Sequence, residues 1–124
     1  MKGSVSIEMI NEYGRHAVLL AIGNQTVCLE AEEVDAMIEH LGAIRAAMRP
    51  ELPKSPSRTH QYAIEMDPCW QSDNHPFYEG SVLFLRHSGL GWVGFALPKH
   101  SMEKLIQTLS SHLMAIQEGT FLPN

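Results

Sequence analysis

Four side chains that could bind a metal ion fall in the second half of the chain: Asp67, Cys69, His75 and His87. Carboxylate oxygen, thiolate sulfur and imidazole nitrogen are the ligands that zinc takes in proteins, usually four in a closed tetrahedron. Such sites usually contain closely spaced cysteine or histidine pairs, and the sequence has neither a Cys-x-x-Cys nor a His-Glu-x-x-His pattern. A metal site at these four residues is therefore one hypothesis. Histidines that respond to pH, or surface histidines without a special role, are the others.

The same residues raise the question of catalysis, with Cys69 as a nucleophile and His75 or His87 as its base. The sequence lacks the glycine-rich phosphate loops, the nucleophile elbow and the paired carboxylates that accompany most such chemistry. It thus favours a protein without catalytic activity and without a cofactor. The alternative is a small enzyme or metal-binding protein with its site near segment 67–80 and hairpin 87–91.

Segment 67–80 also concentrates aromatic residues beside two prolines, which limit the freedom of the chain. Aromatic side chains on a stiff segment are typical of protein-binding hot spots, because they offer a large contact area at a low entropic cost. The alternative is that the Trp and Phe fold inward and close one end of a core. As a binding site, the segment would act through Trp70, His75, Phe77 and Tyr78.

The elements that position this segment come in the same order twice, as three strands and a helix. Alternating apolar residues and turn signals predict strands over 5–10, 16–22, 25–29, 61–66, 81–86 and 92–97. Apolar residues at three- and four-residue steps predict two amphipathic helices, one running from Val34 to Met48 and the other from Met102 to Ile116. The fold class is α+β: two tandem β-β-β-α repeats form a mostly antiparallel sheet of about six strands, with both helices packed on one face.

A chain of 124 residues suits a single domain, and 1–124 is expected to be one. Its repeats would span 1–49 and 60–119, and the proline-rich segment 50–59 would connect them. Segment 67–80 would be a loop insertion that only the second repeat carries. An insertion that breaks a repeat is a natural place to look for function.

Composition and charge narrow the class of partner. The net charge is −5 and the nine basic residues are scattered, which argues against nucleic acid. No apolar run reaches the length of a membrane span or of an export signal, so we expect a soluble, cytoplasmic protein with reduced cysteines. The strands at 16–22 and 81–86 are apolar on both faces. Either the sheet curls around its own core, or a protein partner or a second copy in a homodimer covers the second face.

Overall fold

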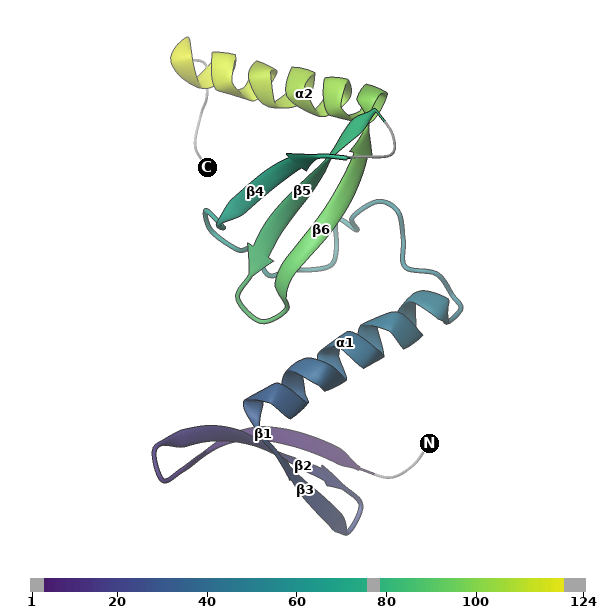
Figure 1. Cartoon of the computed structure of the whole chain (residues 1–124), viewed down its shortest axis with the longest axis vertical. Helices are drawn as coiled ribbons and strands as arrows, with labels where there is room; N and C mark the ends of the chain where they lie inside the picture. Colours follow the sequence, from purple (N-terminus) through teal and green to yellow (C-terminus); the bar gives the residue numbers. More distant parts are fainter. Residues whose placement is uncertain (1–3, 76–78, 120–124) are drawn as a thin grey trace. The chain divides into compact units, whose positions relative to one another are not determined.

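The computed structural model describes residues 4–75 and 79–119, and it divides the chain into two compact units, Met1–Tyr62 and Ala63–Asn124. Both units have the element order β-β-β-α (Figure 1). The α+β class and the antiparallel strands are thereby confirmed. The strands form two three-stranded sheets, however, and not the single sheet that the sequence predicts.

The first unit contains β1 (Val5–Glu12), β2 (Arg15–Ile22), β3 (Gln25–Leu29) and α1 (Ala31–Ala47). β2 is the central strand, with β1 and β3 antiparallel on either side of it. Both hairpins close through two-residue turns. In the first turn both residues have positive φ, and in the second only Gly23 does, as type I′ and type II′ hairpin turns require.

Helix α1 begins directly after β3. The Glu33 carboxylate accepts a hydrogen bond from the Glu30 backbone N–H at 2.9 Å, which pairs one of the donor groups at the start of the helix. Glu32 and Glu33 lie in the first turn and Arg45 in the last, so their charges complement the helix dipole. The helix ends before Pro50, as predicted.

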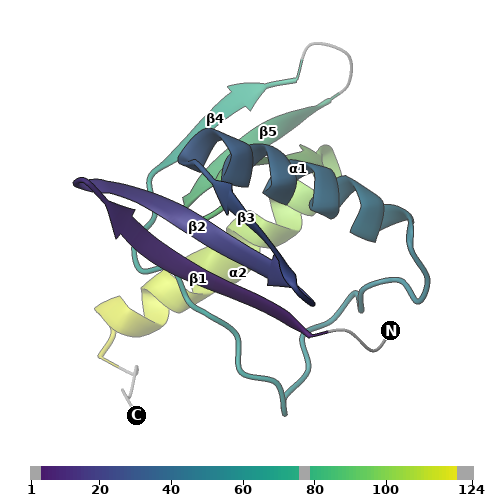
Figure 2. The same ribbon diagram turned by 90° about the horizontal axis from the view of Figure 1, so that it is seen from below.

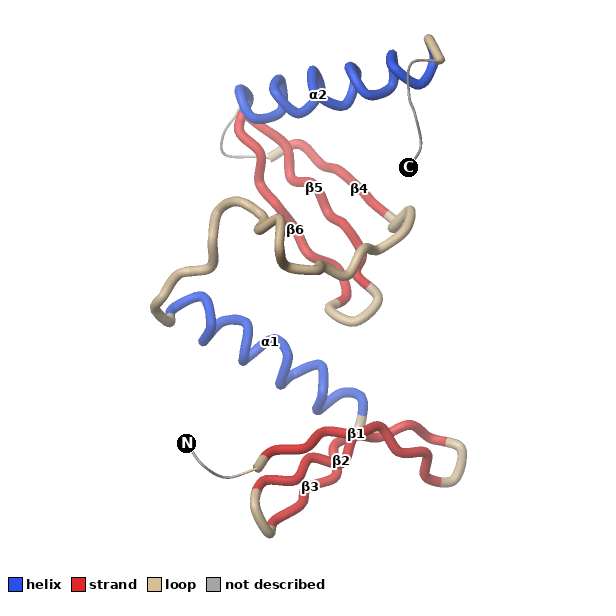
Figure 3. Tube along the Cα trace, turned by 180° about the vertical axis from the view of Figure 1, so that it is seen from behind, coloured by secondary structure: helices blue, strands red, loops and turns tan. Residues whose placement is uncertain are grey.

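The second unit contains β4 (Trp70–Asn74), β5 (Gly80–His87), β6 (Gly91–Pro98) and α2 (Lys99–Gln117), with β5 in the centre of the sheet. Figure 3 shows α2 continuing directly from the end of β6. The Lys99 backbone N–H donates to the Glu79 carbonyl oxygen at 3.0 Å, which ties the start of α2 to the segment before β5. Gly119 follows the helix with a φ of 72°, the left-handed conformation of a helix end.

Two predictions about the second unit are wrong. Residues 61–66 contain no strand, and the first strand of this sheet is instead Trp70–Asn74, inside the segment predicted to be a loop. The Gln-Ser-Asp-Asn sequence has a low intrinsic preference for strands, and its pairing with β5 overrides that preference. Residues 7–9 and 64–66 share the sequence Ile-Glu-Met, but only the first of these segments lies in a strand. The second lies outside the sheet.

None of the helices in the described part of the chain is both long enough and apolar enough to cross a membrane.

The β1–β2 turn gives a direct test of the backbone geometry. Tyr13 is fully exposed and has a φ of 53°, a left-handed conformation that costs an ordinary L-residue about 1–2 kcal/mol. Asn tolerates this region better, so Tyr13→Asn should stabilise the protein. We expect a rise of a few degrees in the thermal midpoint measured by circular dichroism. Gly14→Ala, at a φ of 82°, is the matched control and should lower the midpoint; a lower midpoint for Tyr13→Asn would contradict the assigned turn.

Candidate functional site

The structure places two of the four residues predicted to bind a partner. Trp70 opens β4 and is 66% exposed. His75 follows β4 and is half-buried, and its backbone N–H donates to the Gly80 carbonyl oxygen at 3.2 Å. Phe77 and Tyr78 lie outside the described residues. Within its own unit Trp70 is thus largely exposed and does not close a core.

The four residues of the metal hypothesis are not gathered into a metal site. Within residues 4–75 and 79–119, no group of three or more His, Cys, Asp or Glu side chains is arranged to hold a metal ion. Asp67 occupies a left-handed backbone position with a φ of 46°, and Cys69 is an exposed free thiol. His87 Nδ1 accepts hydrogen bonds from the backbone N–H groups of Gly89 and Leu90, both at 3.0 Å, so its lone pair is already in use.

A polar cluster around His87 instead supports the hairpin between β5 and β6. A Glu65 carboxylate oxygen accepts a hydrogen bond from the Ser88 backbone N–H and lies 3.9 Å from His87 Nδ1. The Ser88 bond is the main cause of a lowered pKa of the Glu65 carboxyl, with smaller contributions from His87 and Arg86. Together Glu65 and His87 accept bonds from three successive N–H groups of the turn. The hydrogen bond from Ser88 to Glu65 holds the segment before β4 against the hairpin. No sequence pattern predicted this contact.

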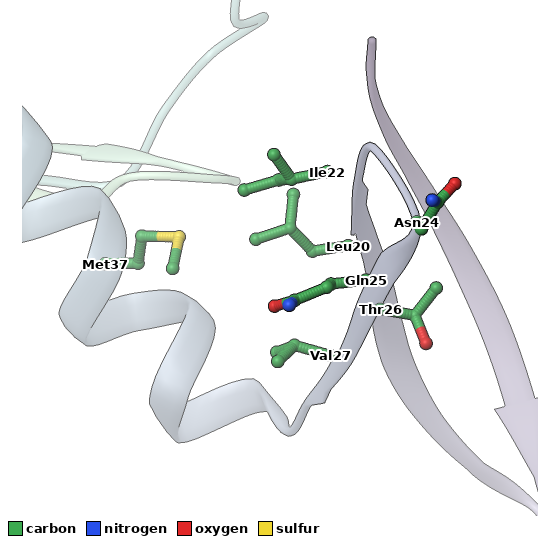
Figure 4. A pocket seen from close by; sticks show the side chains of 7 residues that line it. All are labelled: Leu20, Ile22, Asn24, Gln25, Thr26, Val27 and Met37. Carbon is green, nitrogen blue, oxygen red and sulfur yellow. The ribbon is translucent and has the colours of Figure 1, made fainter. Parts of the chain in front are cut away.

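The most prominent surface feature is apolar. No described residue of either unit is fully buried, and many large apolar side chains are more than half exposed. In the first unit, a groove of about 700 Å³ lies between α1 and the sheet, with Leu20, Ile22, Val27 and Met37 among its lining residues. Figure 4 shows Met37 pointing from α1 toward the sheet side chains.

One wall of this groove continues onto β1. Val5, Ile7 and Met9 pair across the sheet with Ile22, Leu20 and Val18, so they lie on the face that carries the groove. Helix α1 lies closer to β2 and β3 than to β1, the strand farthest from the helix in Figure 2, although Met9 of β1 lines a small pocket together with Val34 and Asp35 of α1. Val5, Ile7 and Met9 are accordingly 57%, 70% and 69% exposed. We call these three residues the β1 strip.

The other wall is α1 itself. Its apolar stripe is two residues wide: Val34 and Ile38 are half-buried, and the remainder is more exposed. The exposed part, which we call the α1 stripe, consists of Met37, Leu41 and Ile44 in the helix and Met48 at its C-cap. Four of the six apolar residues that predict this helix are therefore exposed.

The second unit also has exposed apolar side chains. Helix α2 approaches β5 and β6 but, in the part of the chain that is described, not β4. Trp70 pairs across the sheet with Leu85, which pairs with Val93, and these three share one face. Leu85 and Val93 line a pocket of about 400 Å³ on that face. Most of the apolar stripe of α2 is exposed as well: Ile106, Leu109, Leu113, Met114 and Ile116.

The free energy that burial of these exposed side chains would contribute is large compared with the free energy of unfolding of a small protein. Fully burying a Val, Ile, Leu or Met side chain contributes roughly 1.5–3 kcal/mol. The side chains of the β1 strip and the α1 stripe are about half exposed, so covering them would contribute roughly 5–10 kcal/mol by the same measure. That is comparable to the net stability of a typical domain, about 5–15 kcal/mol. The bare surfaces are thus the strongest candidate functional site.

The Glu65 cluster generates a prediction about pH. A carboxyl whose pKa falls on folding stabilises the folded state above its ordinary pKa, here 4.5, and that stabilisation is lost as the pH falls through the folded-state value. Glu65→Gln should therefore lower stability at pH 7, and its difference from the unmodified protein should shrink below pH 4.5. Urea unfolding at both pH values measures this. Glu103→Gln, on the exposed surface of α2, is the control; a Glu65 effect that is equal at both pH values would contradict the assigned role.

Comparison with known proteins leaves the site to be interpreted from its own geometry. No protein-family model matches the chain, and neither a curated protein nor a solved structure is significantly similar to it.

Proposed function

We propose that the protein is a small non-catalytic binding and assembly module that acts through protein–protein contacts. The observation that carries the proposal is the exposed apolar surface of each unit: the groove beside α1 and the β1 strip in the first, and Trp70 of β4 in the second. Contiguous exposed apolar surface of this kind is typical of interaction sites.

The chemistry of the surface indicates how a partner would bind. A groove between a helix and a sheet fits the apolar face of an amphipathic helix or an extended apolar segment. Trp70 supplies the large, rigid side chain that most often dominates binding energy at such surfaces. His75, Phe77 and Tyr78 complete the partner-binding segment of this proposal.

The proposal extends to the organisation and setting of the protein. It treats the shared β-β-β-α order as a tandem repeat and places the protein in the cytoplasm. The acidic net charge and the scattered basic residues support protein partners over nucleic acid.

Photo-crosslinking tests the function at neighbouring positions on opposite faces of β4. A benzoylphenylalanine replaces Trp70 in one variant and Gln71 in the other, because successive strand residues point to opposite faces. Irradiation of cells that produce the Trp70 variant should give discrete protein adducts on a denaturing gel. The Gln71 variant should give few or none.

Equal adducts from both positions would indicate non-specific contact, and the absence of adducts from Trp70 would overturn the proposed surface in the second unit. Circular dichroism of the purified variants controls for loss of folding.

A further inference from the structure

The turn between β5 and β6 is held by an imidazole nitrogen that can accept hydrogen bonds only while it carries no proton. His87 Nδ1 accepts bonds from the backbone N–H groups of Gly89 and Leu90, both at 3.0 Å. A neutral imidazole has one acceptor nitrogen, whereas both nitrogens of the protonated ring are donors. The turn therefore requires a neutral His87 with its hydrogen on Nε2.

A second group beside the ring is suited to the protonated form. A Glu65 carboxylate oxygen lies 3.9 Å from the same Nδ1 atom and accepts a hydrogen bond from the Ser88 backbone N–H. A carboxylate has lone pairs for several donors, so it can accept an imidazolium N–H without releasing Ser88. His87 thus lies between two incompatible arrangements, in which Nδ1 is either an acceptor for the turn or a donor to Glu65.

We propose that this turn is a pH-sensitive switch. When a proton from solvent adds to His87 Nδ1, the Gly89 and Leu90 N–H groups lose their acceptor, and the imidazolium pairs with Glu65 instead. The switch concerns the turn itself and stands independently of the proposed function.

The charged groups around His87 come from two places. The segment before β4 contributes Glu65, and β5 contributes Arg86. Asp67 and Cys69 belong to the same segment as Glu65 but do not line the pocket beside His87, whose other lining residues are uncharged: Pro68, Leu85, Leu90, Val93 and Phe95. Helix α2 lies at the other end of the sheet from this turn (Figures 1 and 3).

Glu65 and Arg86 keep their charges while a histidine titrates. The hydrogen bond from the Ser88 backbone is the main cause that holds the pKa of the Glu65 carboxyl below its ordinary value of 4.5. A guanidinium is not deprotonated in proteins. Histidine side chains change charge between about pH 5 and 8. Across that range His87 is the one member of this described cluster whose charge changes.

Leu90 extends the effect of protonation beyond the turn. Its backbone N–H is bonded to His87, and the side chains of both residues lie at the pocket of about 400 Å³ that also contains Leu85 and Val93. Release of the turn would change the rim of this pocket. The switch thereby couples pH to the shape of an apolar surface in the second unit.

Nuclear magnetic resonance of the full-length chain tests the switch. Between about pH 7.5 and about pH 5, the amide proton shifts of Gly89 and Leu90 should follow the same midpoint as the His87 ring protons. Their protection from exchange, corrected for the intrinsic pH dependence of exchange, should fall by about tenfold as the acceptor is lost. The Ser88 amide is the internal control and should keep its protection, because its acceptor Glu65 remains.

Three variants separate the imidazole from the turn. The side-chain carbonyl of Asn accepts bonds from the backbone that follows it and takes up no proton, so His87→Asn should keep the turn and abolish the pH response. His100→Asn removes an exposed histidine of α2 and should respond like the unmodified chain. Glu65→Gln keeps an acceptor for Ser88 but loses the charge that pairs with the imidazolium, so the response should move to lower pH.

Amides of Gly89 and Leu90 that do not respond while the His87 ring titrates would overturn the switch, and so would an unchanged response in His87→Asn. An equal loss of protection at Ser88 would mean that the whole hairpin opens, which contradicts the exchange of partners. A response of Glu65→Gln at higher pH would contradict the ion pair. The Trp70 adducts test the proposed function separately, so either proposal can fail while the other holds.

Discussion

One helix is too narrow to cover three strands, and this mismatch governs both units. A helix with its side chains is about 10 Å wide, and neighbouring strands lie about 4.8 Å apart, so a single helix shields about two strands. In each unit the helix follows the third strand and approaches that strand and the central one. In the first unit this leaves Val5, Ile7 and Met9 of β1 mostly exposed on an apolar face, beside the groove next to α1. In the second unit Trp70 of β4 is 66% exposed.

The polar groups of the second unit stabilise a turn and do not form a core. Glu65 and His87 use their acceptor atoms on three backbone N–H groups of the β5–β6 turn. His87, which suggests acid–base or metal chemistry in the sequence, is thus occupied in holding a hairpin together. Hydrogen bonds of this kind fix local structure but bury little apolar area, so they do not replace a core. Each unit therefore still has exposed apolar side chains whose burial would stabilise it.

Local patterns predicted most of the elements. The strand Gln25–Leu29 has the predicted bounds, and β1, β2, β5 and β6 extend the predicted strands by one or two residues at their ends. The strand prediction for segment 61–66 was wrong because alternating residues alone do not make a strand. A strand also needs a partner in register, and β5 pairs with Trp70–Asn74 instead. Composition singled out Trp70 as a candidate binding residue, and its side chain is 66% exposed. The β1 strip escaped notice because a periodic pattern shows which residues are apolar, and not how many strands a following helix can reach.

The outer edge of β1 has a consequence for how the protein behaves at high concentration. Within the described residues β1 bonds only to β2, which leaves a row of backbone donors and acceptors along an apolar strand, the usual starting point for fibrillar growth. Glu8 and Glu12 occupy the face of this strand opposite the strip. In parallel stacks of identical strands in register, these carboxylates would lie directly above one another and repel. Such repulsion would disfavour edge-to-edge stacking of the strand, which is the effect that charged gatekeeper residues have beside apolar strands.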